Sequence, residues 1–215
     1  MAIIKHKSQR VGIFIDTQNL YHSAKNLYKA KVNFGQVVKE AVAGRTLIRA
    51  VAYVIRTESE DEKGFFEALN KLGIETKVKD IRVFAGGAKK ADWDLGTVID
   101  VVAMAKKLDT IILATGDGDF VPLVEYLKYA EGCQVEVIAF GKSSSGQLRD
   151  SADDFIDMCE DPRNYLLGYR GGVGRYIPGF GGKPNGRVNA DTSEETTELP
   201  GNGEGEDPAI KMSGE

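Results

Sequence analysis

The sequence predicts an α/β protein: a three-layer sandwich in which helices cover a mostly parallel sheet of five or six strands. Short, nearly continuous apolar runs end at polar turns, which is typical of strands buried on both faces. Stretches with helical apolar spacing separate these runs, and such alternation favours a parallel sheet with right-handed crossovers. After Leu167 glycine and proline dominate and the pattern stops, so we expect a disordered C-terminal tail.

Length and composition indicate one globular domain with an appendage. The chain has 215 residues, of which 42% are hydrophobic, so it can bury one substantial core but not two large ones. A net charge of −4 gives no overall basic field, so nucleic acid would need a local basic patch or bridging cations. Cys133 and Cys159 are too few for a disulfide scaffold, and His6 and His22 complete no zinc-finger spacing.

Targeting signals are not evident in the sequence. No apolar run approaches the roughly 20 residues that span a bilayer. The opening segment MAIIKHKSQR also lacks the apolar core of a signal peptide. We therefore expect a cytoplasmic protein with reduced thiols and no membrane partner.

Strand-to-helix units open the domain. The apolar run Val11–Ile15 predicts a buried strand that ends on the carboxylate of Asp16, and helical spacing begins at Thr17. One face of this first helix carries Leu20, Ala24, Leu27 and Tyr28. Glycines follow the later helices, as is common at helix ends. The next expected elements are a helix at Phe34–Val42, a strand at Leu47–Ile55, a helix at Glu58–Leu72 and a strand at Ile74–Val78.

The second half of the domain continues the alternation. Ile81–Phe84 is either a hairpin partner or an edge strand, and Gly86-Gly87 separates it from a helix at Trp93–Leu108. That helix carries one broad apolar stripe, made of Leu95, Val98, Ile99, Val102 and Ala105. The remaining expected elements are strands at Ile111–Ala114 and Val135–Phe140, helices at Phe120–Ala130 and Leu148–Ala152, and a final edge strand at Phe155–Met158.

We divide the chain into a short lead at residues 1–10, a domain at 11–160 and a tail at 161–215. In the tail, Tyr169–Val188 combines arginines, glycines and aromatic residues without an acid, a composition that suits sequence-tolerant RNA binding. A plain linker is the alternative. Asn189–Glu215 is acidic and could compete with RNA for the basic half, or the tail could bind a partner protein.

An acidic turn follows the expected strand Ile111–Ala114. Asp117 and Asp119 are separated by one glycine and precede a helix. In a parallel sheet this turn and Asp16 emerge at the same carboxyl edge, where ligands of open α/β sheets bind, and Asp94 can overhang that edge. Converging carboxylates repel one another unless cations neutralise them, and oxygen ligands favour Mg²⁺ or Mn²⁺. A phosphodiester is then the natural substrate, since one or two such ions can activate water and stabilise a leaving oxygen.

Each aspartate also has a simpler explanation, because aspartate commonly caps a helix or occupies its first turn. Capping does not explain why a second acid accompanies Asp119, or why Lys90, Asp92 and Asp94 cluster. Asp100 lies on a different face of the helix from Asp94, so we expect it to support the site. A solvated helix position is the alternative for Asp100.

Several motifs in the same order resemble the NYN domain, the LabA-like branch of the PIN-like nuclease superfamily. The resemblance covers about residues 10 to 160 and implies a Rossmann-like PIN fold, an acidic pocket for Mg²⁺ or Mn²⁺, and ribonuclease activity. The motifs are FIDTQNL at Phe14–Leu20, KADWDLGTVID at Lys90–Asp100, TGDGDFVPL at Thr115–Leu123 and FGKSSSGQLRDSADDFI at Phe140–Ile156.

The resemblance also implies roles for single residues. The family's metal-binding and catalytic acids match Asp16, Asp94, Asp117 and Asp119. Its substrate-binding or supporting positions match Asn19, Lys90 and Asp100; for Lys90, a solvated loop lysine is the alternative. A family glutamate on an earlier helix is not matched, because Glu62 and Glu67 also fit a solvated helix face, so one and two ions both stay open.

The sequence therefore predicts a Mg²⁺- or Mn²⁺-dependent endoribonuclease that acts on RNA, expected to be single-stranded. The alternative is a non-cleaving RNA-binding or regulatory module that keeps the acidic pocket, and a homodimer is also left open. Other phosphate chemistries fit less well, since the chain has no GxxxxGK[ST] loop and no GxSxG elbow. The segment FIDTQN also lacks the second acid of an aspartyl-phosphate hydrolase.

Overall fold

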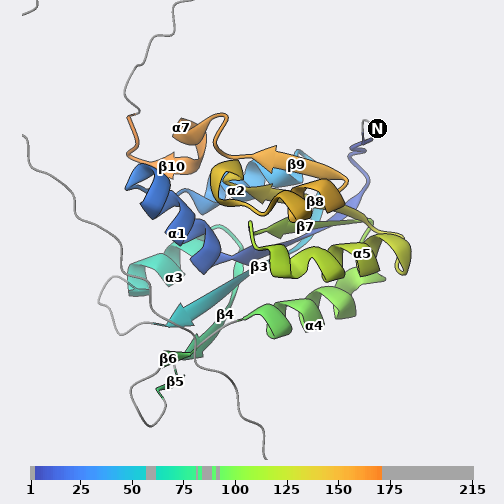
Figure 1. Ribbon diagram of the computed structural model, residues 1–215, viewed down its shortest axis with the longest axis horizontal. Coiled ribbons are helices and arrows are strands. Elements are labelled where there is room, and N and C mark those ends of the chain that lie inside the picture. The colour runs from blue at the N-terminus through green and yellow to red at the C-terminus, as the bar shows by residue number, and fades with distance from the viewer. Residues whose placement is uncertain (1–2, 57–61, 81, 84–88, 91–92, 171–215) are drawn as a thin grey trace, which may run out of the picture. The chain divides into compact units, whose positions relative to one another are not determined.

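Six parallel strands form the central sheet of the computed structural model, which describes residues 3–56, 62–80, 82–83, 89–90 and 93–170 (Figure 1). The strand order is β4-β3-β1-β7-β8-β9, and every neighbouring pair in it is parallel. Apart from the tail, this confirms the predicted fold class. The strands are β1 (Arg10–Asp16), β3 (Thr46–Arg56), β4 (Glu75–Asp80), β7 (Thr110–Ala114), β8 (Gln134–Ala139) and β9 (Asp154–Asp157).

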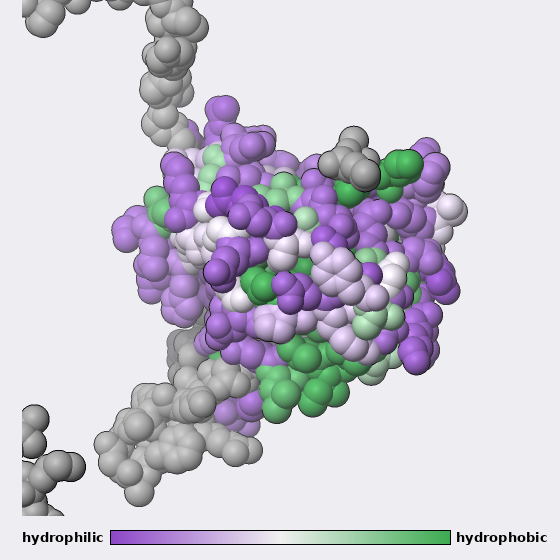
Figure 2. All heavy atoms as spheres, turned by 45° about the vertical axis from the view of Figure 1, so that its right-hand side comes forward, coloured by the Kyte–Doolittle hydropathy of each residue, from purple (hydrophilic) through white to green (hydrophobic). Residues whose placement is uncertain are grey.

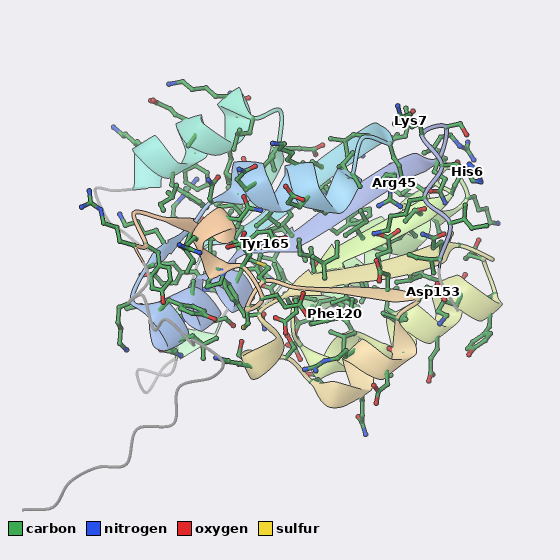
Figure 3. The ribbon with its side chains drawn as sticks, turned by 90° about the horizontal axis from the view of Figure 1, so that it is seen from above. His6, Lys7, Arg45, Phe120, Asp153 and Tyr165 are labelled. Atoms are coloured by element: carbon green, nitrogen blue, oxygen red, sulfur yellow. The ribbon has the colours of Figure 1, made fainter. Side chains whose placement is uncertain are left out.

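Helices cover both faces of this sheet and one of its edges. Figure 3 shows α2 and α3 on one side of the sheet and α5 and α6 on the other, while Figure 1 shows α4 beside α5. Helix α1 runs along the carboxyl edge towards the end of β8. There Ser23 hydrogen-bonds to Ser143 and the Tyr28 ring packs on Phe140, both of which follow β8. The helices are α1 (Thr17–Tyr28), α2 (Phe34–Val42), α3 (Glu62–Lys71), α4 (Asp94–Ala105), α5 (Val121–Tyr129), α6 (Gly146–Ser151) and α7 (Pro162–Tyr165).

The core lies where these helices meet the two central strands. In β1 the side chains from Val11 to Ile15 are buried, and all five residues of β7 are buried. Burial on both faces accounts for their nearly continuous apolar sequences. Among the helices that the structure describes, none is long and apolar enough to cross a membrane.

Helix α4 buries only one side of its apolar stripe, because Ala105 is buried and Val98 and Val102 pack against the core. Its buried residues are Thr97, Val101 and Ala105, whereas Leu95 is 70% exposed and Ile99 is 59% exposed. Figure 2 shows a hydrophobic surface on the lower side of the molecule, where α4 lies in Figure 1. The apolar stripe is therefore broader than the surface that the sheet can cover.

Short antiparallel ladders complete the described chain. β10 (Leu166–Leu167) pairs with β2 (Lys31–Val32), and Tyr165 and Leu166 are buried in the core. Ordered packing therefore continues past residue 160, where we had expected the tail to begin. β5 (Arg82–Val83) pairs with β6 (Lys89–Lys90), which agrees with the hairpin interpretation of Ile81–Phe84. The expected start of the α3 helix at Glu58 and most of the tail lie outside the described residues.

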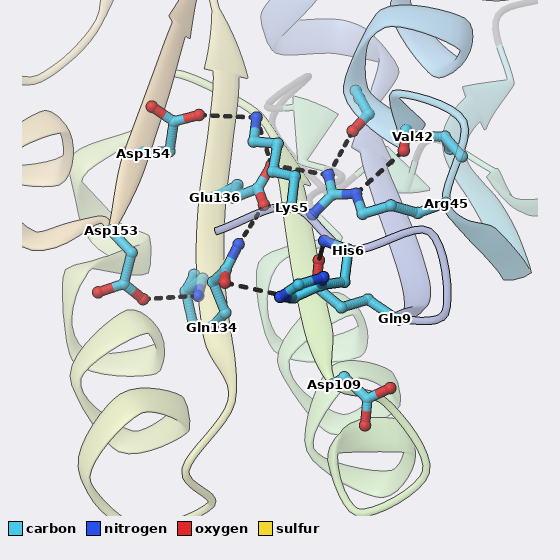
Figure 4. A network of polar contacts seen from close by, with 12 residues as sticks. Lys5, His6, Gln9, Val42, Arg45, Asp109, Gln134, Glu136, Asp153 and Asp154 are labelled. Carbon is cyan, nitrogen blue, oxygen red and sulfur yellow. Dashed lines mark hydrogen bonds and ion pairs between the residues drawn. The ribbon is translucent and has the colours of Figure 1, made fainter. Parts of the chain in front are cut away.

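At the amino edge of the sheet, a buried ion pair joins Arg45 to Glu136 (Figure 4). Both side chains are fully buried, and Arg45 also donates to the carbonyl oxygens of Ala41 and Val42. Lys5 lies 3.2 Å from the Glu136 carboxylate and brings the N-terminal segment into the network. These contacts provide the partners that buried charges require.

Candidate metal centre

The candidate centre lies at the point where the strand order changes direction. From β1 the chain leads to β3 on one side, and β7 lies on the other. β1 and β7 are parallel neighbours, with Ile15 opposite Ala114, so Asp16 and Thr115 leave the sheet side by side. Such a switch point opens a crevice at the carboxyl ends of the strands, where α/β proteins bind ligands.

Asp16 caps a helix, which is the simpler explanation that the sequence offered for each aspartate. It is the N-cap of α1, and its Oδ1 accepts a hydrogen bond from the Asn19 backbone N–H at 3.0 Å. Its Oδ2 accepts from the Thr115 hydroxyl at 3.3 Å. Burial raises the pKa of this carboxyl above its usual 3.8, and the nearby charge of Asp117 adds to that effect. Asp16 is thus a fixed carboxylate whose negative charge is poorly solvated.

Hydrogen bonds hold the turn after β7. The Asp117 side chain caps the short helix Gly118–Phe120 (η1) by accepting from the Asp119 N–H at 3.0 Å, and Phe120 is buried (labelled in Figure 3). The side-chain oxygen of Asn19 accepts from the Gly116 N–H at 2.9 Å. Asn19 therefore ties α1 to the acidic turn.

Close packing against the loop after β8 explains the two glycines of this turn. A Cβ atom added to Gly116 would lie 2.5 Å from the Ser144 hydroxyl and 3.0 Å from its Cα. A Cβ on Gly118 would lie 2.8 Å from the Ser145 hydroxyl. The Ser145 N–H donates to the Gly116 carbonyl at 2.9 Å, and Ser145 caps α6. These serines lie in the segment FGKSSSGQLRDSADDFI, but the sequence reasoning gave them no role.

Asp94 reaches the carboxyl edge of the sheet from the start of α4, the helix that lies beside α5 (Figure 1). Trp93 occupies the N-cap position of α4 without a capping side-chain bond, so Asp94 is the first helical residue and not the cap. The Trp93 indole N–H donates to the Val54 carbonyl at 3.0 Å, and its ring packs on Tyr53 with centroids 5.5 Å apart. These contacts fix the start of α4 above β3.

Three of the four predicted acids converge closely. One carboxylate oxygen from each of Asp94, Asp117 and Asp119 lies within 4.8 Å of the other two. Asp94 and Asp117 are partly buried, and Asp119 is exposed. Asp16 is outside this close group but lines the same pocket, whose volume is about 210 Å³. The pocket is lined by Asp16, Gln18, Asn19, Ile55, Trp93, Asp94 and Asp117.

Of the remaining predicted residues, Asp100 lies apart from the acid cluster, and the side chain of Lys90 lies outside the described residues. Asp100 accepts hydrogen bonds from the Tyr53 hydroxyl at 2.9 Å and from Lys77 at 2.7 Å. Its connection with the pocket therefore runs through Tyr53 and Trp93. The backbone of Lys90 belongs to β6, but its side chain lies outside the described residues, as does Asp92.

The sequence reasoning missed three residues that line the pocket, Gln18, Ile55 and Trp93. Gln18 belongs to the segment FIDTQNL, and Trp93 belongs to the segment KADWDLGTVID. Trp93 is also the single tryptophan of the chain, and its position next to Asp94 could have marked it as a pocket residue. Of the two glutamates considered as a further ligand, Glu67 is exposed on α3, and the side chain of Glu62 lies outside the described residues.

Comparisons with known proteins give a consistent result. The sequence pattern of the NYN domain matches residues 10–159. The low amplitude and bright protein LabA of Synechococcus elongatus is 27% identical over 171 residues, which cover 74% of this chain and 89% of LabA. A crystal structure of a Vibrio parahaemolyticus protein of unknown function superposes with a TM-score of 0.69 at 28% identity. That alignment covers 77% of this chain and all of the Vibrio chain.

Proposed function

The chain belongs to the NYN domain family of PIN-like nucleases, and from this membership and its acid cluster we propose that it is a Mg²⁺- or Mn²⁺-dependent endoribonuclease. The observation that carries the proposal is the convergence of Asp94, Asp117 and Asp119, with Asp16 in the same pocket. Its substrate would be the phosphodiester backbone of RNA, in line with the nucleic-acid binding that the family suggests.

The donor set suits a hard divalent cation. The cluster consists of aspartate oxygens alone, which favour Mg²⁺ or Mn²⁺ over softer metals. Ligands about 2.1 Å from Mg²⁺ lie at most about 4.2 Å apart, so oxygens within 4.8 Å need only small side-chain rotations to share an ion. A cation would also offset the unfavourable burial of the Asp16 charge, which raises that carboxyl's pKa.

The surrounding residues fix the acids in place. Asp16 is held by Asn19 and Thr115, and Asn19 holds the turn that carries Asp117 and Asp119. A bound divalent ion would supply Lewis-acid chemistry, which polarises a phosphoryl oxygen and lowers the pKa of water. Holding the acids rigidly limits the reorganisation needed when the scissile phosphate binds.

Two predicted residues receive supporting roles in this proposal. Asp100 orients Tyr53, whose ring packs on Trp93, and so helps to position Asp94 at the start of α4. Lys90 remains a proposed phosphate contact, because it matches the lysine that precedes the acid at the start of this helix in the family.

Incubation of labelled single-stranded RNA with the purified protein tests the proposal. We expect cleavage by the wild type with Mn²⁺, and none with a chelator or with the Asp117→Asn variant. Glu125→Gln is the matched control, because Glu125 is an exposed acid on α5 and should retain full activity. Equal RNA loss in every sample would indicate a contaminating nuclease. RNA binding without cleavage would favour the alternative, a non-cleaving RNA-binding or regulatory module.

A further inference from the structure

Helix α1 presents a continuous exposed stripe that no catalytic role uses. Residues spaced by three or four positions share one side of a helix, and here they are the partly exposed Gln18 and the exposed Tyr21, His22 and Lys25, with Lys29 following at the C-cap. Tyr21 is 43% exposed, and the Lys25 ammonium lies 5.5 Å from its ring centroid. The opposite side, with Leu20 and Ala24, is buried. No acid occurs between Thr17 and Lys29.

The stripe begins at the acid pocket. Gln18, its first residue, lines that pocket beside Asp16 and Asn19. From Gln18 to Lys29 the helix rises by roughly 16 Å. An RNA strand that has one phosphate bound through a cation at the acids can therefore continue along α1 without leaving the carboxyl edge of the sheet.

The stripe ends at a second, open pocket of about 440 Å³. The rings of Tyr28 and Tyr169 meet there edge to face, with centroids 5.3 Å apart, and Lys29 and Arg170 add two exposed cations. In Figure 1 the end of α1 lies beside β10, which leads to this pocket. Its lining residues are Tyr28, Lys29, Ala30, Leu167, Gly168, Tyr169 and Arg170.

We propose that single-stranded RNA lies along this stripe, which runs from the acid pocket to the Tyr28–Tyr169 pocket. The proposal rests on the ribonuclease function proposed above and assigns it a substrate-binding surface. Cations that follow the backbone, together with aromatic rings for base stacking, are the features that bind single strands irrespective of sequence. They suit RNA better than an apolar protein partner, because the stripe is polar and basic in a chain of net charge −4. The nearby Asp157 carboxylate is already engaged by the Gly141 and Cys159 N–H groups.

The role of the cations is tested by measuring RNA affinity at several salt concentrations. Chelator is present so that the RNA is not cleaved. Removing one cation that neutralises a phosphate of a single strand reduces the slope of log affinity against log salt by about 0.7. We therefore expect the slope of the Lys25→Ala/Arg170→Ala variant to be smaller than that of the wild type by about 1.4. In cleavage assays with Mn²⁺ its KM should rise several-fold while kcat stays unchanged.

The control carries the same charge change at a different place. Lys106 and Lys107 are exposed in the turn after α4, at the amino edge of the sheet, so Lys106→Ala/Lys107→Ala should keep the wild-type slope. Tyr21→Ala should weaken binding about tenfold, because it removes a ring on which a base can stack, whereas Tyr21→Phe keeps the ring and the affinity. Unchanged unfolding midpoints would show that each variant is folded.

The possible outcomes separate this inference from the proposed function. Equal salt slopes for the two double variants, in a protein that cleaves RNA, would overturn the α1 surface alone. The expected slopes without any Mn²⁺-dependent cleavage would overturn the ribonuclease and leave the surface in place. A wild-type protein that does not bind single-stranded RNA would overturn both.

Discussion

At the scale of single residues, Asp16 shows that capping a helix does not exclude a place in the candidate site. Its carboxylate caps α1 and also lines the acid pocket. A cap alone would sit at a solvated helix end, but here burial raises the carboxyl pKa. Serine or asparagine caps a helix about as well, without placing a negative charge there. The charge at this position therefore favours a role beyond capping.

Replacing Asp16 by Asn should stabilise the metal-free protein while removing its activity. The raised pKa means that the folded state binds this proton more tightly than the unfolded state does. Stability of the metal-free wild type therefore falls as pH rises from 3.8 through the higher folded-state pKa, and Asp16→Asn should lack this contribution. Urea unfolding in chelator at acidic and at neutral pH measures the difference.

A lower stability of Asp16→Asn at neutral pH would contradict this expectation. It would show that the hydrogen bonds from Asn19 and Thr115 to the charged carboxylate outweigh its burial. The RNA cleavage assay is the second measurement. Retained cleavage in Asp16→Asn would exclude this acid from the metal site.

At the scale of elements, the acidic turn is positioned by the loop that follows the neighbouring strand. Gly116 and Gly118 allow contact with Ser144 and Ser145, and the Ser145 N–H closes the contact by donating to Gly116. The glycines in TGDGD thus permit close approach of two loops. Any widening between these loops would move Asp117 and Asp119 away from Asp94.

Substituting Gly116 by Ala should destabilise the protein by about 1–3 kcal/mol, the usual cost of overpacking. The added Cβ would meet Ser144 at 2.5 Å from its hydroxyl and 3.0 Å from its Cα, so rotation of the hydroxyl alone cannot relieve the clash. Cleavage activity should fall as the turn shifts. Gly64→Ala is the control, because an added Cβ on this α3 glycine meets nothing within 4 Å. That variant should gain up to about 1 kcal/mol, since alanine is the better helix former. Equal unfolding midpoints for the two variants would refute the packing explanation.

The elements that the sequence predicted well are those whose signals are local. Helix α2 begins at Phe34 and ends at Val42 as expected, because Asn33 caps it and the chain turns at Ala43. The apolar stripe of α4 did not predict which of its side chains are buried, because that depends on how the helix packs on the sheet. Leu95 and Ile99 lie outside the packed surface. β10 was missed because two residues carry no periodic signal, and its position depends on pairing with β2.

The same contrast holds for the candidate centre. Motif order and the parallel topology were enough to place Asp16, Asp94 and Asp117 around one pocket. Helix periodicity predicted that Asp100 lies apart from Asp94, but not its partner Lys77, which comes from β4, a strand without a motif. Asn19 was expected to bind substrate or to support the site, but the sequence did not predict that its side-chain oxygen accepts from Gly116, a backbone partner that only the fold brings near.

At the scale of the whole molecule, the two edges of the sheet treat charge differently. At the amino edge, Arg45 and Lys5 surround the buried Glu136, so that carboxylate is compensated within the fold (Figure 4). At the carboxyl edge, acids from both helical layers converge on one pocket. In the first arrangement the charge partners belong to the chain itself, whereas the second becomes more favourable when a cation binds. The difference predicts that added metal should act on stability through the carboxyl edge.

Mn²⁺ should therefore raise the unfolding midpoint of the wild type. A ligand that binds only the folded state at 100 times its Kd adds about 2.7 kcal/mol of stability. For a domain of this size, that corresponds to a shift of roughly 5–10 °C. Thermal unfolding with Mn²⁺ and with chelator measures it, and Glu125→Gln, with an exposed acid removed, should show the full shift. Asp117→Asn should show little or none, because it removes one of the three converging carboxylates. If Asp117→Asn shifts as far as the wild type, the ion binds elsewhere, and the acids at this edge have another role.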